Sequence, residues 1–204
     1  MQIEKHELDH LAAVDADLKS LIARYGDLSF PDSKDIYKDL IDTIIGQMLS
    51  YQAANTISRR VQEAVGAPDY DCAKLKDMDV SMLRACGLST IKAQSILDLA
   101  RRTHMGTLKL GSLVNMSDAE VIIFLSGLKG IGPWTAEMIA LFSLGKKNIF
   151  SDGDVALKAG IMKAKGYKTV SKKRMAMLKK RYAPYGSIAS IYFYRCRDDA
   201  GYVR

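Results

Sequence analysis

The sequence predicts an all-α fold of about ten helices. Apolar residues recur at helical spacing along most of the chain, and cap and breaker residues stand where such segments begin and end. No segment shows the sustained alternation that indicates a strand. The length of 204 residues suits one domain or two small lobes, and 48% hydrophobic with 26% charged residues is typical of a globular protein. This composition excludes a disordered tail, a collagen and a disulfide scaffold.

Local signals delimit the predicted helices in the first half of the chain. The apolar stripe from Ile41 to Leu49 has the spacing of a helix with one buried face. The same spacing recurs between Ser89, which can cap a helix, and Gly106, which can end one.

Similar signals continue in the second half. Ser117 and Glu120 have the spacing of a capping box. Pro133 and Pro184 each stand where a first helical turn begins, which is the helical position that proline tolerates best. Ser171 opens a basic helix. Together these signals predict helices over residues 3–25, 36–49, 52–65, 71–76, 79–85, 90–105, 118–126, 133–144, 154–165, 171–182 and 185–196.

Positive charge is concentrated at the C-terminal end of the chain. The formal net charge is +7, but residues 146–204 hold 15 Lys and Arg against 4 Asp and Glu, a local net of +11. The other residues hold 15 against 19, a net of −4. A basic third on a mildly acidic body favours a face that meets a polyanion over a charge that serves solubility alone. The backbone-contact candidates in it are Lys172, Lys173, Arg174 and Lys179.

Cysteine content and hydropathy exclude several other classes of protein. The 3 cysteines are scattered and form no CxxC pair, so no disulfide framework, zinc site or iron–sulfur site is expected. The first ten residues contain no apolar run that would mark a signal peptide. The longest apolar stretches fall far short of the roughly 20 residues that span a bilayer. We therefore expect no membrane partner and a cytoplasmic protein, associated with the nucleoid in a prokaryote or nuclear in a eukaryote.

The segment Leu128–Ala136, with the sequence LKGIGPWTA, is the most informative part of the chain. A tight turn with two glycines connects two predicted helices, and such a hairpin exposes backbone N–H groups where an anion can bind. The spacing superficially fits a dinucleotide-binding fingerprint, but that motif needs a preceding strand, and here a helix precedes it. A plain αα-hairpin with a glycine turn remains the alternative.

Several blocks extend this hairpin into a pattern over nearly the whole chain, which resembles the helix-hairpin-helix DNA glycosylase superfamily. Within it, the chain is most similar to the alkylpurine branch, the 3-methyladenine DNA glycosylase II family. Only the helical part of that family is matched, without the additional N-terminal β-domain of the bacterial form. The matching blocks are IIGQMLSYQAANTI at 44–57, GLSTIKAQSILDLA at 87–100, GLKGIGPWTAEMIALFSLG at 127–145, FSDGDVALKAGI at 150–161 and YAPYGSIASIYFYR at 182–195.

The resemblance implies two helical lobes with DNA across the cleft between them. One lobe comprises residues 36–146 and includes the hairpin, and the other comprises 1–35 with 147–204. Asp154 matches the catalytic aspartate of the family, whose carboxylate stabilises the positive charge that develops on the sugar as a purine leaves. The alternative is that Asp154 only caps the helix that follows it. Asp152 is the second candidate for the catalytic carboxylate and is interpreted as a turn residue.

The residue after Pro133 bears on the type of reaction. Superfamily members that also nick the strand carry a lysine there as a Schiff-base nucleophile, whereas this chain has Trp134, which cannot form an imine. The resemblance therefore implies a monofunctional glycosylase that leaves an abasic site.

The resemblance also implies a base pocket. Trp134 and Tyr194 match pocket aromatics, and an electron-rich ring stacked on a cationic alkylated purine gains cation–π attraction. Either residue could instead be an ordinary buried aromatic. Met138 and Val155 stand where the bacterial relative has tyrosines, which makes the pocket less aromatic and leaves its base preference open.

For DNA binding, Met48 matches the intercalating residue that fills the space of a flipped nucleotide, although periodicity alone equally allows a core methionine. The hairpin residues Gly130, Ile131 and Gly132 match the phosphate-binding turn. The family implies no cofactor, apart from a monovalent cation under the hairpin. Its ligands here would be the backbone carbonyls of Ser126, Leu128 and Gly130.

The resulting expectation is a monomeric base-excision repair enzyme acting on double-stranded DNA that contains damaged bases. It would hydrolyse the N-glycosidic bond of alkylated purines of the 3-methyladenine and 7-methylguanine type. Two alternatives remain: excision of another base such as hypoxanthine, and a non-catalytic helix-hairpin-helix protein that binds damaged or abasic DNA.

Overall fold

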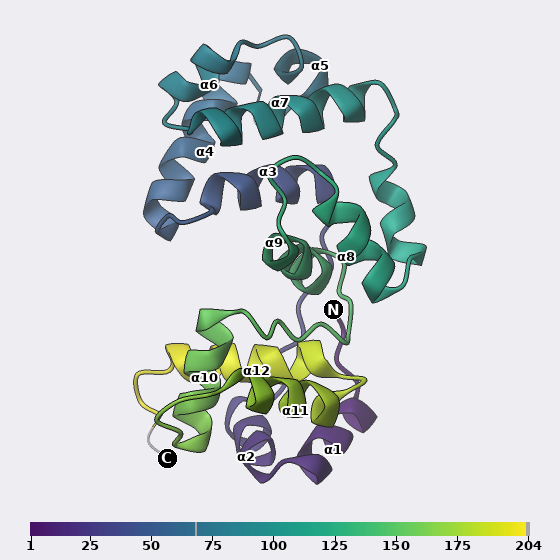
Figure 1. Cartoon of the computed structure of the whole chain (residues 1–204), viewed down its shortest axis with the longest axis vertical. Coiled ribbons are helices and arrows are strands. Elements are labelled where there is room, and N and C mark those ends of the chain that lie inside the picture. Colours follow the sequence, from purple (N-terminus) through teal and green to yellow (C-terminus); the bar gives the residue numbers. More distant parts are fainter. Residues whose placement is uncertain (68, 203–204) are drawn as a thin grey trace. The chain divides into compact units, whose positions relative to one another are not determined.

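The structure is a computed structural model that describes residues 1–67 and 69–202. All regular elements in these two ranges are helical, which confirms the predicted fold class. The chain forms two compact units (Figure 1). Unit 1 comprises Met1–Asp32 and Ala140–Arg204, and unit 2 comprises Ser33–Ile139.

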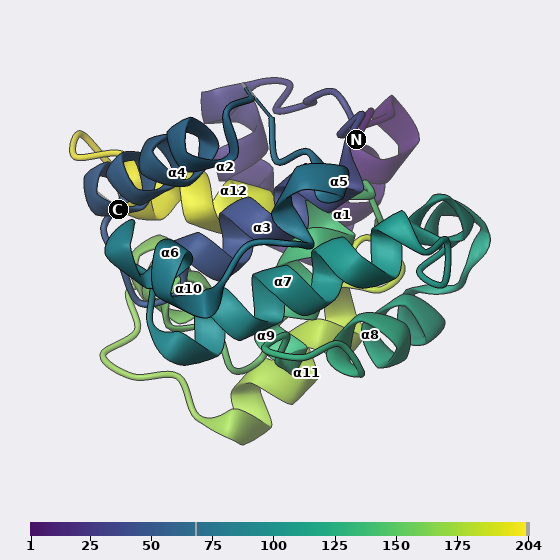
Figure 2. The ribbon, with the colours of Figure 1, turned by 90° about the horizontal axis from the view of Figure 1, so that it is seen from above.

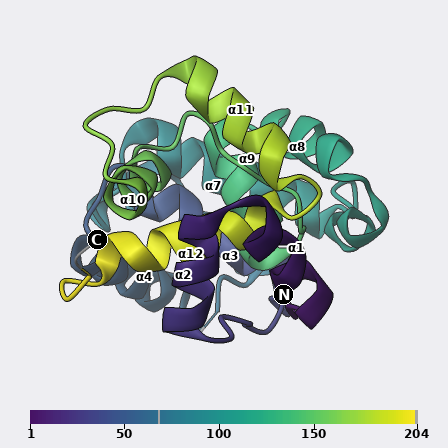
Figure 3. The same cartoon turned by 90° about the horizontal axis from the view of Figure 1, so that it is seen from below.

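Unit 1 is built around its C-terminal helix. Figure 3 shows α12 crossing this unit with α2 packed on it. Tyr182, Phe193 and Phe150 are among its largest fully buried side chains and form part of one apolar core. The helices of unit 1 are α1 (Lys5–Val14), α2 (Ala16–Tyr25), α10 (Val155–Lys165), α11 (Lys172–Tyr182) and α12 (Gly186–Asp198).

Asp15 divides the first predicted helix into two, so the prediction of one helix over 3–25 is wrong. Its backbone is extended, with φ −151° and ψ 115°, and its side chain accepts hydrogen bonds from the N–H groups of Asp17 and Leu18. An aspartate that caps a new helix in this way cannot also continue the old one.

The Asp15 carboxylate is also the buried partner of a lysine far along the chain. Lys165 Nζ, at the end of α10, donates to Asp15 Oδ2 at 2.6 Å, and both side chains are almost fully buried. The hydroxyl of Tyr182 donates to the same oxygen at 2.8 Å. Burial raises the pKa of Asp15, but these hydrogen bonds lower it by more, and its pKa lies below the ordinary value.

Helices α10 and α12 cross at a glycine, and their backbones approach each other closely there. A Cβ on Gly160 of α10 would lie 2.1 Å from the carbonyl oxygen of Phe193 on α12. Only glycine lets the two backbones approach to this distance.

Unit 2 is arranged around α7 (Thr90–His104). In Figure 1, α7 runs across the unit with α5 and α6 on one side and α3 on the other. Figures 1 and 2 show α8 beside α9. The helices are α3 (Ile36–Gly46), α4 (Tyr51–Val65), α5 (Cys72–Leu75), α6 (Val80–Ala85), α7 (Thr90–His104), η1 (Leu110–Asn115), α8 (Asp118–Ser126) and α9 (Pro133–Met138), and the π-helical turn η2 (Ile139–Ser143) follows.

Three features of this region differ from the predictions. The helix expected over 36–49 ends at Gly46, and the one expected over 133–144 changes to π-helix after Met138. The 3-10 helix Leu110–Asn115 was not predicted, because so short an element has too few residues to show a period. In the described part of the chain, no helix is long and apolar enough to cross a membrane.

We expect Gly160→Ala to destabilise the protein by about 3 kcal/mol, since the new methyl group would force α10 and α12 apart. Urea denaturation would measure the loss. Gly111→Ala is the matched control, because a Cβ there meets nothing within 4 Å. The free energy of unfolding of this variant should differ from that of the unaltered protein by less than about 0.5 kcal/mol. Equal stability of the two variants would contradict the close crossing.

Asp15→Asn should destabilise the protein at pH 7 by about 3 kcal/mol, because the buried ammonium of Lys165 would lose its buried carboxylate and keep only that of Asp17, which is 3.1 Å away and partly exposed. The pKa of Asp15 is lowered in the folded state, so its ionised form stabilises the fold above about pH 4. This contribution is lost as the pH falls through the lowered pKa. Urea denaturation of both proteins from pH 7 to pH 3 should therefore show their difference shrinking below about pH 4. A constant difference would show that the ion pair does not stabilise the fold.

Candidate functional site

Asp154 caps α10 and at the same time contacts an aromatic residue of α12. Asp154 is 4% exposed. Its Oδ1 accepts a hydrogen bond from the N–H of Leu157 at 2.8 Å. Oδ2 accepts a hydrogen bond from the hydroxyl of Tyr194 at 3.1 Å. The capping role is therefore present, and it leaves the second carboxylate oxygen facing Tyr194. The N-terminal end of the helix dipole also favours negative charge at this position.

Two further aromatic residues of unit 1 extend from Tyr194. The ring centroid of Phe142 lies 6.0 Å from that of Tyr194, and that of Phe30 lies 6.0 Å from Phe142. Phe142 is 45% exposed, so its ring is accessible next to the residue that contacts Asp154. Sequence reasoning missed both phenylalanines. The available signal for Phe142 was its position four residues after Met138, which would place the two on one face of a regular helix.

The other predicted pocket residues have different environments. Val155 directly follows Asp154 at the start of α10 and is 80% exposed. Trp134 and Met138 lie on α9 in unit 2, where Trp134 is 47% exposed and Met138 is half-buried. Trp134 is thus not a core residue. Asp152, in the turn before Asp154, is exposed.

At one position of the hairpin between α8 and α9, the fold leaves no room for a side chain. Gly130 has φ +79°, and a Cβ there would lie 2.3 Å from Ser95 Oγ on α7. Ile131 is buried, and its N–H donates to the carbonyl of Leu128 at 3.1 Å. Gly132 is exposed at the N-cap of α9, and a Cβ there would meet nothing within 4 Å. Its open surroundings allow an anion to approach the backbone.

Met48 lies in the turn that follows α3, here called the Met48 turn (residues 46–50). Its φ of +58° makes it the one non-glycine residue with positive φ in residues 1–67 and 69–202. The left-handed conformation costs a non-glycine residue about 1–2 kcal/mol. Its side chain is fully exposed, so the alternative of a core methionine is wrong. The apolar stripe misled here because α3 ends at Gly46, before the stripe is complete.

Two polar side chains that sequence reasoning missed connect the Met48 turn to its neighbours. Lys92 Nζ, from α7, donates to the carbonyls of Ile45 at 2.9 Å and Gln47 at 2.6 Å. Gln47 Nε2 donates to the carbonyl of Gly130 at 3.0 Å and to Thr135 Oγ1 at 3.2 Å. Partial burial lowers the pKa of Lys92. No sequence signal marks either residue, because their acceptors are backbone carbonyls of distant segments.

The predicted cation ligands can be compared with the hydrogen bonds around them. The carbonyl of Leu128 accepts a hydrogen bond from the N–H of Ile131, and the carbonyl of Gly130 accepts one from Gln47 Nε2. Each carbonyl oxygen has a second lone pair that could bind a cation. The three predicted ligands are backbone carbonyl oxygens, which are neutral and suit a hard cation. The side-chain Oγ of Ser126, which is not one of them, is buried without a hydrogen-bond partner in the described part of the chain.

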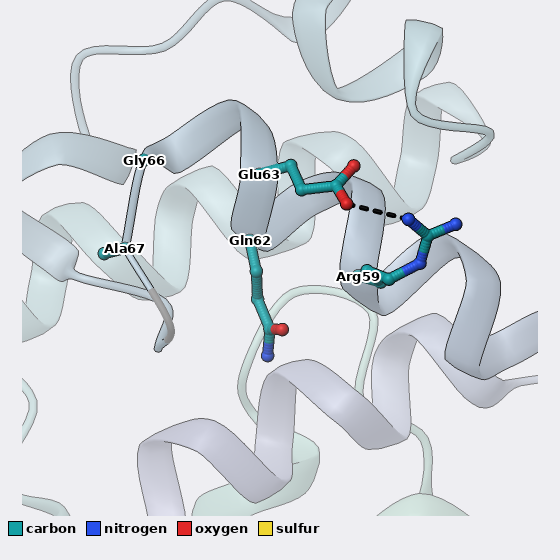
Figure 4. Close-up of a pocket in the computed structure, with 5 residues that line it drawn as sticks. All are labelled: Arg59, Gln62, Glu63, Gly66 and Ala67. Atoms are coloured by element: carbon teal, nitrogen blue, oxygen red, sulfur yellow. Dashed lines mark hydrogen bonds and ion pairs between the residues drawn. The ribbon is translucent and has the colours of Figure 1, made fainter.

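Two hollows of unit 2 lie beside α4. One, of about 410 Å³, is at the C-terminal end of the helix and is lined by Arg59, Gln62, Glu63, Gly66 and Ala67 (Figure 4). Arg59 and Glu63 form an ion pair with each other there, at 2.8 Å, so this hollow has no unbalanced charge. The other, of about 480 Å³, adjoins the Met48 turn, and its lining includes Leu49, Tyr51 and Asn55.

Solved structures of DNA glycosylases resemble nearly the whole chain. A DNA-3-methyladenine glycosidase from Bacillus halodurans is 30% identical, with a TM-score of 0.85 over 98% of this chain and 92% of that one. The 3-methyladenine DNA glycosylase Mag1 of Schizosaccharomyces pombe, solved in complex with abasic DNA, is 27% identical. Its TM-score is also 0.85, over 98% of this chain and 100% of that one.

Sequence comparison leads to the same group of proteins. The DNA-3-methyladenine glycosylase 1 of Schizosaccharomyces pombe is 27% identical over 201 residues, which are 96% of this chain and 88% of that protein. Residues 41–184 match the HhH-GPD superfamily base excision DNA repair proteins, and this range contains the Met48 turn, the hairpin and Asp154. The resemblance seen in the sequence is thereby confirmed, and the chain belongs to the HhH-GPD superfamily of base excision DNA repair proteins.

Proposed function

We propose that this protein is a DNA-3-methyladenine glycosylase that hydrolyses the N-glycosidic bond of alkylated purines in double-stranded DNA. The observation that carries the proposal is the buried carboxylate of Asp154, oriented by the N–H of Leu157 and the hydroxyl of Tyr194. Relatives that are similar over nearly the whole chain have this activity in their names.

Asp154 would act on the sugar. As the bond between C1′ and the purine breaks, the base leaves with the bonding electron pair and positive charge develops on the sugar. A fixed carboxylate stabilises that charge and orients the water whose oxygen bonds to C1′, and the proton that this water loses passes to the carboxylate and then to solvent. Because an alkylated purine is already cationic, it becomes neutral on leaving and needs no general acid. Trp134, in place of a lysine, has no amine to attack C1′, so the product is an abasic site on an intact strand.

Aromatic rings would select the base. Trp134 is proposed to stack on the cationic purine, and the half-buried ring of Tyr194 and the exposed ring of Phe142 to supply further aromatic surface beside Asp154. Met138 and Val155 contribute apolar surface without a ring. A neutral, undamaged purine gains no cation–π attraction from such a pocket, which favours the alkylated base.

The protein would act as a monomer. Its remaining site residues would contact the DNA duplex. The exposed side chain of Met48 is proposed to fill the space of the flipped nucleotide. The backbone of Gly130, Ile131 and Gly132 would bind a phosphate. The carbonyls of Ser126, Leu128 and Gly130 are proposed to hold a monovalent cation, which when bound adds positive charge beside that phosphate.

We expect Asp154→Asn to lower base release by at least about 100-fold, because the charge that stabilises the sugar is lost. Asparagine is an equally good N-cap, so the fold should be retained. The assay is release of 3-methyladenine and 7-methylguanine from methylated duplex DNA. With the unaltered protein the strand should break only after alkali treatment.

Asp152→Asn is the matched control, because it removes one carboxylate from the same turn at an exposed position. It should release base at nearly the normal rate. If neither the unaltered protein nor the variants release base while all of them bind DNA, the protein is a binding module and not an enzyme. If Asp154→Asn is as active as the unaltered protein, the assignment of the catalytic residue is wrong.

Trp134→Ala should lower excision of 7-methylguanine by about 2- to 30-fold, which corresponds to the loss of one cation–π contact. Affinity for undamaged duplex should change much less. Single-turnover excision and fluorescence anisotropy would measure the two effects. Met105→Ala is the control, since Met105 is 65% exposed at the end of α7 and is not part of the proposed site. Equal losses of excision and duplex affinity would indicate that Trp134 only packs.

A further inference from the structure

We propose that Lys92 and Gln47 are positioning residues, which hold Met48 outward and join the Met48 turn to the phosphate-binding hairpin. Met48 acts as a wedge only under the proposed function, so this assignment rests on that function. The assignment explains how Met48 keeps its unfavourable backbone conformation before DNA is bound.

The Met48 turn needs support from outside itself. Met48 has φ +58°, and its fully exposed side chain makes no packing contact that could hold this conformation. Within the turn, the N–H of Leu49 donates to the carbonyl of Gly46. A strained residue persists when its surroundings determine its conformation, so the supporting contacts come from other segments.

Lys92 supplies the first support. The final carbonyls of a helix have no partner within the helix, and they form the negative end of its dipole. Lys92 Nζ bridges two such carbonyls, those of Ile45 and Gln47, on either side of the end of α3. The residue that precedes Met48 is thereby held by a charged hydrogen bond from a different helix.

Gln47 supplies the second support. Its side-chain amide donates to the carbonyl of Gly130, the residue that is pressed against Ser95 of α7. It also donates to Thr135 Oγ1 at the start of α9. Lys92 and Ser95 are three residues apart and share one face of α7. This face of α7 therefore lies under both DNA-contacting loops and keeps the wedge at a fixed distance from the phosphate-binding backbone.

Lys92→Met should lower single-turnover base excision by about 10- to 100-fold, the range expected when a reacting group is misplaced by about 1 Å. The methionine keeps the length of the apolar stem and removes the ammonium. Insertion of Met48 can be followed with a duplex that carries 2-aminopurine beside an abasic-site analogue, because unstacking changes its fluorescence. The Lys92→Met signal should approach that of Met48→Ala.

A double-mutant cycle tests whether Lys92 acts through Met48. If it does, Lys92→Met lowers excision in the normal protein but has little further effect in a Met48→Ala background. Gln47→Leu, which cuts the link to Gly130 from the other side, should behave in the same way. It also provides the test if Lys92→Met does not fold, as judged by thermal unfolding.

Lys74→Met is the matched control, because Lys74 Nζ also donates to a helix-terminal carbonyl, that of Gly66 at the end of α4, at 3.1 Å. It removes the same charge and should leave excision and fluorescence unchanged. Equal losses from Lys92→Met with and without Met48, or no effect of Met48→Ala itself, would overturn the inference. Failure of the proposed function would appear separately, as base excision that does not depend on Asp154.

Discussion

The close crossing of α10 and α12 determines where the candidate catalytic carboxylate lies in unit 1. Gly160 meets the backbone of Phe193 so closely that no side chain fits between them. The crossing lets the hydroxyl of Tyr194 on α12 donate a hydrogen bond to Asp154 at the start of α10. The other end of α10 is held by the buried pair of Lys165 and Asp15. The helix that presents Asp154 is therefore fixed at both ends by contacts with distant segments, which is the preorganisation that electrostatic catalysis requires.

In unit 2 a single helix has the corresponding role. Ser95 of α7 leaves room only for glycine at position 130, and Lys92 holds the end of α3. Of the two loops proposed to contact DNA, the Met48 turn holds a residue with a strained backbone and an exposed side chain, and the hairpin exposes Gly130 and Gly132. Contacts with one helix, α7, compensate for the strain at Met48, because backbone strain at functional loops persists only where a scaffold determines it.

Much of the fold was predictable because helix formation leaves a local pattern in the sequence. The capping box at Ser117 and the proline that opens α9 were both found in the structure as expected. The errors have specific physical causes. Asp15 interrupts the first predicted helix because it both caps α2 and binds Lys165, a residue 150 positions away. Met48 continues an apolar stripe in the sequence, but the helix ends two residues earlier and leaves its side chain in solvent.

The sequence by itself determined the all-α class, the glycine hairpin, the family and Asp154 as the candidate carboxylate, because each depends on residues close together or on a recognisable order of motifs. Only the tertiary structure decided which groups surround those residues. The hydroxyl of Tyr194 on Asp154, the ring of Phe142 beside it and the bonds of Lys92 and Gln47 to the Met48 turn arise from helix packing. Such contacts join segments far apart in the chain, and local spacing carries no information about which backbone carbonyl a distant lysine or glutamine will meet.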